Sequence, residues 1–185
     1  MIEVLAGTNR PGSNTLKVAH IIEGLYKKLG ADVQVLSLES MPPEIFQPTS
    51  YVAKPEGWKK ITDRILNADG VHVVTPEYNG GFPGVLKYFI DMLPFPASFE
   101  SRCVAFTGIA SGVWGAFRPV EQLQMIFAYR NAFILPQRVW ITGITNKLDE
   151  QGHLTDSAAT KMLESQTEKF VDFTKRHEGQ AVKAE

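Results

Sequence analysis

The sequence contains a single cysteine, Cys103, so a disulfide within the chain is excluded. The thiol lies in the apolar run RCVAFTGIA, a setting typical of a buried strand residue, which we favour over a reactive thiol. The four histidines show no metal-ligand spacing, and no Ser-His-Asp arrangement is evident, so neither a metal site nor a catalytic residue is predicted.

Long hydrophobic runs are also missing. No stretch reaches eighteen apolar residues, and the N-terminus lacks a basic region followed by a long apolar one, so we expect no membrane span and a cytoplasmic protein. The 19 basic and 20 acidic residues leave a net charge of -1. This balance gives no electrostatic reason to expect nucleic acid or a membrane surface as a partner.

What the sequence does contain is typical of one globular domain. The chain has 185 residues, of which 44% are hydrophobic and 21% charged. We predict one domain over residues 1–177, followed by a frayed tail over residues 178–185.

Apolar runs and amphipathic segments alternate five times along the chain. Strands are predicted at 2–7, 32–38, 70–76, 102–110 and 132–143, the last interrupted at Pro136. Helices are predicted at 13–30, 57–67, 82–93, 114–130 and 156–177, with Thr155 as the cap of the last. Such alternation predicts an α/β fold with a mostly parallel sheet covered on both faces.

In an open sheet of this kind, ligands bind beyond the carboxyl ends of the strands. The loop after the first strand, GTNRPGSNT, offers hydroxyl and amide side chains, the cation Arg10, and glycines that let backbone amides converge before a helix. These features suit an anion such as phosphate. The alternative is a polar turn in which Ser13 or Asn14 only caps the helix.

The loops after the third and fourth strands are also unusual. Residues 76–81, Pro-Glu-Tyr-Asn-Gly-Gly, combine a restricted proline, a flat aromatic and glycines that permit close approach to a planar ligand. Residues 110–118 add Ser111 and Trp114, although a tryptophan of the core is the simpler interpretation of Trp114. The three loops together suit a ligand with a phosphate at one end and a flat ring at the other.

These loops resemble those of the NAD(P)H-dependent FMN reductases, a family of the flavodoxin-like superfamily that includes quinone, azo-dye and chromate reductases. A Gly-Ser/Thr-x-Arg-x-x-Ser stretch followed by Asn is matched from Gly7 to Asn14, and Pro-x-Tyr-Asn-x-x-x-Pro-Gly-x-Leu-Lys is matched from Pro76 to Lys87. A glycine-rich loop before an Arg-containing helix is matched loosely by Gly112, Gly115 and Arg118.

The resemblance implies a flavodoxin-like three-layer sandwich with a five-stranded parallel sheet in the order 2-1-3-4-5. It implies FMN as cofactor, with NADPH or NADH as co-substrate. The residues implied to hold the FMN phosphate are Thr8, Arg10, Ser13, Asn14 and Thr15. Those implied to line its ring are Pro76, Glu77, Tyr78, Asn79 and Gly80, with Ser111 and Gly112 near its other edge.

The chain departs from the family pattern at two places. Where the family often has Lys-Asn-Ala-Ile-Asp, this sequence reads Lys-Tyr-Phe-Ile-Asp over residues 87–91. The change adds aromatic bulk to the predicted third helix, which in the family lies near subunit contacts. The second departure is Ala116, which stands where the family has a second glycine.

The function that the resemblance implies is hydride transfer from nicotinamide through FMN to an acceptor such as free flavin, a quinone or an azo compound. One alternative is an electron carrier of flavodoxin type, although a net charge of -1 lacks the acidic docking surface of such carriers. Another is a flavin-free interaction module on the same fold. The apolar third helix and the segment MLPFPASF after it predict a homodimer or homotetramer, unless they fill a broad core.

Overall fold

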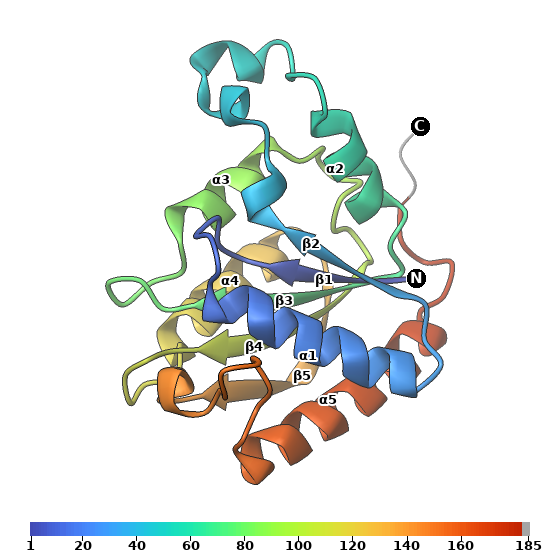
Figure 1. The fold of residues 1–185 in the computed structure, drawn as a ribbon. Helices are drawn as coiled ribbons and strands as arrows, with labels where there is room; N and C mark the ends of the chain where they lie inside the picture. The colour runs from blue at the N-terminus through green and yellow to red at the C-terminus, as the bar shows by residue number, and fades with distance from the viewer. Residues whose placement is uncertain (183–185) are drawn as a thin grey trace.

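The computed structural model describes residues 1–182 and shows one five-stranded sheet (Figure 1). All strand pairs are parallel, and the order is β2-β1-β3-β4-β5, as predicted. Residues 183–185 of the predicted tail lie outside the described residues. The strands are β1 (Ile2–Ala6), β2 (Val33–Ser37), β3 (Gly70–Pro76), β4 (Cys103–Ile109) and β5 (Phe133–Ile141).

Helices cover both faces of the sheet and complete the three predicted layers. Helices α1 and α5 pack on one face, while α2, α3 and α4 pack on the other (Figure 1). The helices are α1 (Asn14–Lys28), α2 (Trp58–Leu66), α3 (Gly84–Met92), α4 (Phe117–Tyr129) and α5 (Ser157–Arg176).

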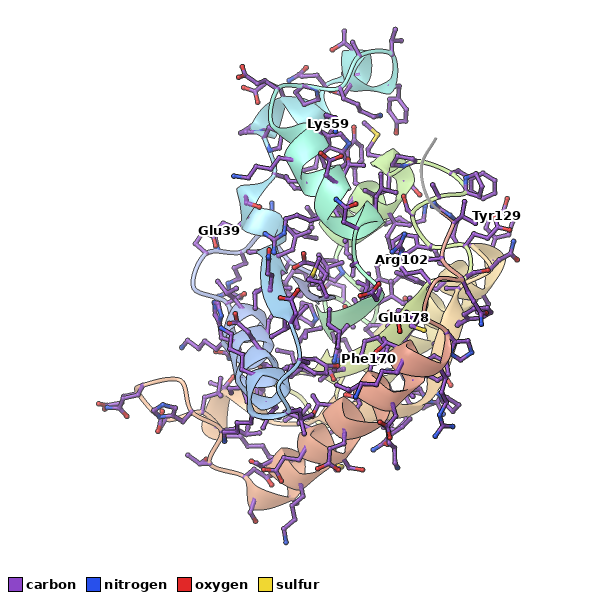
Figure 2. The ribbon with its side chains drawn as sticks, turned by 90° about the vertical axis from the view of Figure 1, so that its right-hand side faces the viewer. Glu39, Lys59, Arg102, Tyr129, Phe170 and Glu178 are labelled. Atoms are coloured by element: carbon purple, nitrogen blue, oxygen red, sulfur yellow. The ribbon has the colours of Figure 1, made fainter. Side chains whose placement is uncertain are left out.

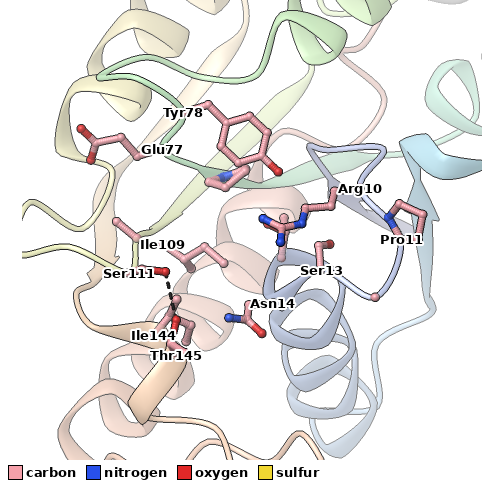
Figure 3. A pocket seen from close by; sticks show the side chains of 14 residues that line it. Arg10, Pro11, Ser13, Asn14, Glu77, Tyr78, Ile109, Ser111, Ile144 and Thr145 are labelled. Atoms are coloured by element: carbon pink, nitrogen blue, oxygen red, sulfur yellow. Dashed lines mark hydrogen bonds between the residues drawn. The ribbon is translucent and has the colours of Figure 1, made fainter.

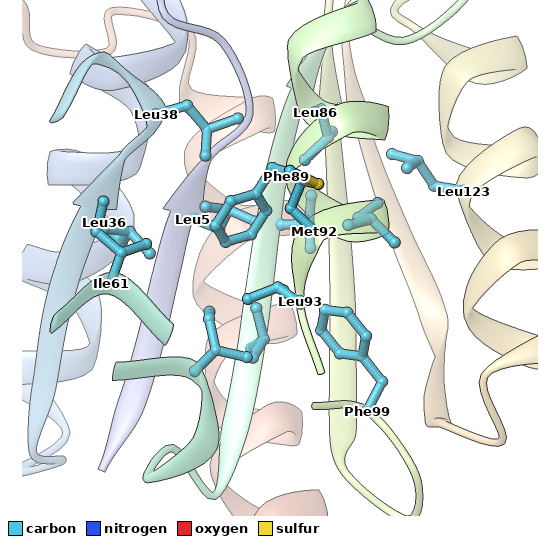
Figure 4. Packing of buried hydrophobic residues seen from close by; sticks show 14 of the residues in the cluster. Leu5, Leu36, Leu38, Ile61, Leu86, Phe89, Met92, Leu93, Phe99 and Leu123 are labelled. Atoms are coloured by element: carbon cyan, nitrogen blue, oxygen red, sulfur yellow. The ribbon is translucent and has the colours of Figure 1, made fainter. Parts of the chain in front are cut away.

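Burial on both faces explains the apolar composition of the central strands. Every residue of β1, β3 and β4 is buried, whereas the outer strands β2 and β5 mix buried and accessible residues. On the face covered by α3, Leu86 and Phe89 pack over Leu5 of β1 (Figure 4). The sheet is therefore a rigid base for the loops at its carboxyl edge.

The predicted interruption at Pro136 is a bulge rather than a break. Strand β5 runs through the proline, but its register against β4 shifts between the pairs Val104 with Ile134 and Phe106 with Arg138. Proline lacks a backbone N–H to donate to the ladder, and β5 is an edge strand, where such a bulge is tolerated.

The start of α5 differs from the prediction. Asp156, not Thr155, is the N-cap: its carboxylate accepts hydrogen bonds from the N–H groups of Ala158 at 2.9 Å and Ala159 at 3.0 Å. A carboxylate accepts two such bonds at once and favours the positive end of the helix dipole, so it is the better cap.

The proline-rich segment after β2 folds into three short 3-10 turns, Leu38–Ser40, Pro43–Phe46 and Pro48–Tyr51. Tyr88 of α3 holds this segment, because its hydroxyl donates to the carbonyl oxygen of Ile45 at 2.7 Å. The Tyr88 and Phe46 rings lie 5.0 Å apart. One of the aromatic departures from the family pattern thus fastens this segment to the domain.

Most of the apolar surface predicted for the third helix is internal. Leu86, Phe89 and Ile90 are buried in the core. In the segment that follows, Pro94, Phe95 and Pro96 are exposed, and the other residues of MLPFPASF are buried. The broad-core interpretation is therefore correct for α3. On α4, Met125 and Tyr129 are exposed, and Figure 2 shows Tyr129 at the surface.

A polar network crosses the buried layer between the sheet and the helices α1 and α5. His72 of β3 is fully buried, with its Nδ1 atom 2.8 Å from the Tyr26 hydroxyl and its Nε2 atom 2.9 Å from the Thr107 hydroxyl. Thr107 donates in turn to Gln166 of α5 at 2.7 Å. The network joins α1, β3, β4 and α5, and both ring nitrogens of His72 have a hydrogen-bond partner.

A buried cation fastens the opposite, amino edge of the sheet. The guanidinium of Arg102, 1% exposed, donates to the carbonyl oxygen of Ala68, and to those of Ser98 at 2.7 Å, Leu66 at 3.1 Å and Ala97 at 3.2 Å (Figure 2). Burial lowers the pKa of Arg102 to about 10, so the group remains charged at neutral pH.

Candidate functional site

A pocket of about 320 Å³ opens at the carboxyl edge of the sheet (Figure 3). It is formed by the loops after β1, β3 and β4 and by a short 3-10 turn after β5, η4 (Ile144–Asn146). Its lining residues are Arg10, Pro11, Gly12, Ser13, Asn14, Thr15, Pro76, Glu77, Tyr78, Ile109, Ala110, Ser111, Ile144 and Thr145.

The first loop supplies the start of α1. Gly12 turns the chain with φ +62°, a left-handed conformation that favours glycine. Ser13 is the helix N-cap, and its hydroxyl accepts from the N–H of Leu16 at 3.2 Å. The first residues of α1 line the pocket, so the positive end of the helix dipole faces it. Arg10 reaches into the same space and adds a full positive charge (Figure 3).

A hydrogen bond joins the first loop to the second. The hydroxyls of Thr8 and Tyr78 lie 2.9 Å apart, and the Thr8 oxygen also accepts from the N–H of Arg10 at 3.3 Å. Thr8 is buried and does not line the pocket. Its role in this structure is to hold the two loops together.

The second loop is a tight turn that projects from β3. Tyr78 and Gly81 exchange two backbone hydrogen bonds, at 2.8 Å and 3.0 Å, and the two residues between them, Asn79 and Gly80, have φ values of +52° and +78°. Positive φ at both central positions is the geometry for which Asn-Gly is preferred. The turn fixes Tyr78 at the pocket while its own tip lies outside the lining.

Glu77 connects the second loop to the third. Its carboxylate accepts a hydrogen bond from the N–H of Ala116 at 3.1 Å and lies 3.8 Å from the guanidinium of Arg118. Ala116 is the N-cap of α4 and has φ +63°, which explains why a glycine is common at this position in the family pattern. Among residues 1–182, Glu77 is the only carboxylate that lines the pocket, and it is thus directed at the protein itself.

The predicted core position of Trp114 is wrong. The indole is 62% exposed, and the guanidinium of Arg118 stacks on it at 5.1 Å. Trp114 does not line the pocket but lies on the outer part of the third loop. A cation–π contact with Arg118 therefore holds this exposed indole in place.

A fourth segment, not expected from the sequence, closes the pocket. The hydroxyls of Thr145 in η4 and Ser111 in the third loop lie 2.9 Å apart (Figure 3). Ile144 is buried beneath them. The signal for this segment was available in the position of ITNK, residues 144–147, directly after the fifth predicted strand. The loops that follow parallel strands at their carboxyl ends all lie at the same edge of the sheet.

The structure gathers most of the predicted site residues around one space. Eight of the twelve line it, whereas four do not: Thr8, Asn79, Gly80 and Gly112. Thr8 lies behind the lining, Asn79 and Gly80 form the tip of the second turn, and the Gly112 carbonyl accepts from the N–H of Gly143 at 3.2 Å. The lining residues not predicted are Pro11, Gly12, Ile109, Ala110, Ile144 and Thr145.

Two glycines allow the loops to approach the sheet closely. A β carbon on Gly7 would lie 2.9 Å from the carbonyl oxygen of Val74, and one on Gly108 would lie 2.8 Å from that of Gly115. Contacts this short between a side chain and backbone are not tolerated without movement. The first and third loops therefore depend on the absence of a side chain at these positions.

Two kinds of feature are missing from the described part of the chain. Among residues 1–182, no group of three or more His, Cys, Asp or Glu side chains is placed to hold a metal ion. None of the helices described there is long and apolar enough to cross a membrane.

Comparison with known proteins identifies the family. A model of the NADPH-dependent FMN reductases matches residues 1–147. The quinone reductase of Escherichia coli (strain K12) is 31% identical over 183 residues, covering 95% of each chain. An NAD(P)H-dependent FMN reductase of Pseudomonas aeruginosa is 25% identical over 179 residues, again covering 95% of each.

Solved structures share the fold. The flavoenzyme FerB, an NAD(P)H:(acceptor) oxidoreductase from Paracoccus denitrificans, matches with a TM-score of 0.81 at 24% identity, over 95% of this chain and 97% of that one. The family match and the relative at 31% identity together show that the chain belongs to the NADPH-dependent FMN reductase family.

Proposed function

We propose that the protein is an FMN-dependent NAD(P)H oxidoreductase that uses NADPH or NADH to reduce a small acceptor. The observation that carries the proposal is the pocket at the carboxyl edge of the sheet, where a helix N-terminus and Arg10 lie beside Tyr78 and an apolar wall. Membership of the NADPH-dependent FMN reductase family supports FMN as the ligand of this pocket.

The residues present fit FMN. At one end of the pocket, the hydroxyls of Ser13 and Thr15, the amide of Asn14, the Arg10 guanidinium and the first turn of α1 form a donor set suited to a phosphate dianion. At the other end, Pro76, Tyr78, Ile109 and Ala110 offer flat and apolar surface for a ring system, and the Ser111 hydroxyl can serve the polar edge of such a ring.

Bound FMN would supply the redox chemistry, accepting hydride from a nicotinamide and delivering electrons to the acceptor. The chain has to bind, orient and shield the cofactor, and it needs no acid or base for that purpose. Glu77 agrees with the absence of a catalytic acid or base, because its carboxylate holds the third loop instead of facing the pocket (Figure 3).

The acceptor that we propose is of quinone type, with free flavin and azo compounds as further candidates. Support comes from the relatives named quinone reductase, one of them 31% identical over nearly the whole chain. The two alternatives have less support. An electron carrier would need an acidic docking surface, which a net charge of -1 does not provide, and a flavin-free module would not need a pocket lined by phosphate donors.

The first test is an absorbance spectrum of the purified protein after FMN addition and desalting, followed by anaerobic titration with NADPH and then NADH. We expect retained flavin that bleaches with either nicotinamide and regains its colour with benzoquinone. Retained flavin that is inert to both nicotinamides would favour the carrier, and protein that retains no flavin would favour the flavin-free module.

A second test compares FMN with riboflavin, which differs from it by the phosphate group. Replacing Arg10 with alanine removes one charged donor, so the affinity for FMN should fall about tenfold, corresponding to roughly 1.4 kcal/mol. The affinity for riboflavin, which lacks the phosphate, should not change. Lys169→Ala, which removes a charge from α5 outside the pocket, is the matched control.

We further propose that the protein is cytoplasmic and forms a homodimer or homotetramer through the outward side of α4. Met125 is 68% and Tyr129 77% exposed, and Phe117 on the same helix is also exposed. Apolar side chains gathered on one surface favour a protein contact. Sedimentation should show a species larger than 20.6 kDa that dissociates when Met125 and Tyr129 are both replaced with glutamate.

A further inference from the structure

We propose that a second groove, between α1 and α5, binds a small aromatic anion. The groove has a volume of about 520 Å³ and is separate from the flavin pocket, with which it shares no lining residue. Helices α1 and α5 lie side by side on one face of the sheet (Figure 1). The turn over residues 151–154 lines the groove together with these helices and is called its closing turn here. Its volume lies within the range of small-molecule sites.

The floor of the groove is apolar. Ile21 and Leu25 come from successive turns of α1, and Leu154 comes from the closing turn. Leu25 is buried, while the other two are partly accessible. Apolar surface of this kind favours a ligand with a hydrocarbon or aromatic body.

Gly24 lies in the middle of α1, at the groove, and the fold gives no reason for a glycine there. Its φ is not in the left-handed region, and a β carbon on it would meet nothing within 4 Å. A glycine inside a helix is less stable than alanine because it loses more conformational freedom on folding. The absent side chain leaves a flat stretch of helix backbone, over which a planar ring can lie closely.

The edges of the groove carry mainly positive charge. Lys17 and Lys28 lie on α1 three turns apart, roughly 16 Å along the helix axis. Neither lysine forms an ion pair with another described residue. The Cδ atom of Lys17 lies 3.6 Å from the position that a β carbon on Gly152 would occupy, so the stem of this side chain runs beside the closing turn.

The other polar side chains at the groove that bear on its charge are His20, His153 and Glu164. Each imidazole is already paired, His20 with Glu23 and His153 with a carboxylate of its own turn. Glu164 of α5 is the one carboxylate among the lining residues, which include the two lysines. Because the lining has two lysines and one carboxylate, it favours an anion. The apolar floor and the exposed backbone at Gly24 favour an aromatic body, so the expected ligand is an aryl carboxylate or sulfonate.

The test is a titration of the isotope-labelled full chain with 2-naphthalenesulfonate, followed by amide chemical shifts. We expect saturable shifts at Gly24 and Gly152, with a dissociation constant below about 1 mM. The neutral analogue 2-naphthalenemethanol should bind about tenfold more weakly, because it lacks the charge. The assignment of the shifts separates this groove from the flavin pocket, so the result stands whether or not the protein binds FMN.

Variants test the charge and the shape separately. The double variant Lys17→Glu/Lys28→Glu should bind the sulfonate at least about tenfold more weakly, and Glu164→Gln should bind it several-fold more tightly. Gly24→Leu should abolish binding by filling the groove, with a melting temperature that shows the helix intact. Lys169→Glu, on α5 outside the groove, changes the charge by the same sign and should have no effect.

The proposal is overturned by any of three results. The first is the absence of saturable shifts at groove residues up to about 10 mM ligand, a concentration at which even a weak specific site would be occupied. The second is a set of shifts confined to the flavin pocket. The third is equal affinity of the wild type and the double lysine variant for the sulfonate.

Discussion

The carboxylate of Glu77, the first residue after β3, accepts a hydrogen bond from the N–H of Ala116, 39 residues further along the chain, at a distance of 3.1 Å. Glu77 is the link between the second loop of the pocket and the N-terminus of α4. The side chain is only 13% exposed, so water does not easily replace the bond when it is lost.

Replacing Glu77 with alanine should therefore weaken FMN binding by about 1–3 kcal/mol, through a loosened third loop. Glu77→Gln keeps an oxygen acceptor for the N–H and should lose less. Fluorescence quenching of FMN measures both affinities, with Glu121→Ala on the exposed side of α4 as control. Equal losses in the alanine and glutamine variants would mean that charge near Arg118, not the hydrogen bond, is what matters.

The bond between the hydroxyls of Thr8 and Tyr78 predicts an energetic coupling between the first two loops. Thr8→Val and Tyr78→Phe each remove one partner with little change in shape. In a double-mutant cycle of urea unfolding, the two losses should overlap by about 0.5–1.5 kcal/mol. Thr8→Ser restores the hydroxyl and should recover most of the stability. Fully additive losses in the double variant would show that the contact contributes no free energy.

Gly108→Ala should destabilise the protein by about 1–3 kcal/mol, because the new methyl group would overlap the backbone of the third loop. FMN affinity should fall together with stability, since that loop borders the pocket. Gly84→Ala at the start of α3 is the matched control, because a β carbon there meets nothing within 4 Å. Thermal unfolding of the two variants, recorded without flavin, gives the comparison; similar midpoints would mean that the loop shifts at little cost.

Glu3 and His72 should make the free energy of unfolding depend on pH in opposite directions. Burial raises the pKa of Glu3 from 4.5 to about 7, although two hydrogen bonds from Arg64 act against the rise. Between these values the folded protein holds a proton that the unfolded chain has lost, so stability falls as pH rises from 4.5 to 7. Burial lowers the pKa of His72 from 6.5 to about 3, so its stability contribution is lost as pH falls through that window.

The two slopes, each at most about 1.4 kcal/mol per pH unit, oppose one another between pH 4.5 and 6.5. Wild-type stability should accordingly be nearly constant there, whereas Glu3→Gln should lose stability steadily with falling pH. Urea unfolding at half-unit intervals from pH 4.5 to 8 measures both proteins. If the variant shows the same profile as the wild type, Glu3 is ionised throughout and its pairing with Arg64 outweighs its burial.

The sequence predicted those features that repeat or that are local. Strands buried on both faces are continuous apolar runs in the sequence, so the three layers of the fold could be inferred. The loop after β1 contains its helix cap, Ser13, and its cation, Arg10, close together in the sequence, so most of the pocket could be inferred too. Contacts between distant segments left no such pattern. Nothing near Glu77 in the sequence indicates that its partner is Ala116, and nothing near Tyr88 indicates that it holds Ile45. The core position expected for Trp114 failed for a related reason, because residue type alone does not show on which side of a loop a side chain lies.

The buried His72 network has a consequence for the alignment of the strands. Strand β3 is apolar on both faces, so its pattern of hydrophobicity alone does not tell one face from the other. A slip of one residue against its neighbours would turn His72 toward α3, into a cluster of leucine and phenylalanine side chains, where its ring nitrogens would find no hydroxyl groups. The imidazole, paired only on the side of Tyr26 and Thr107, thus marks the single correct register of a strand whose end supplies Pro76 to the pocket.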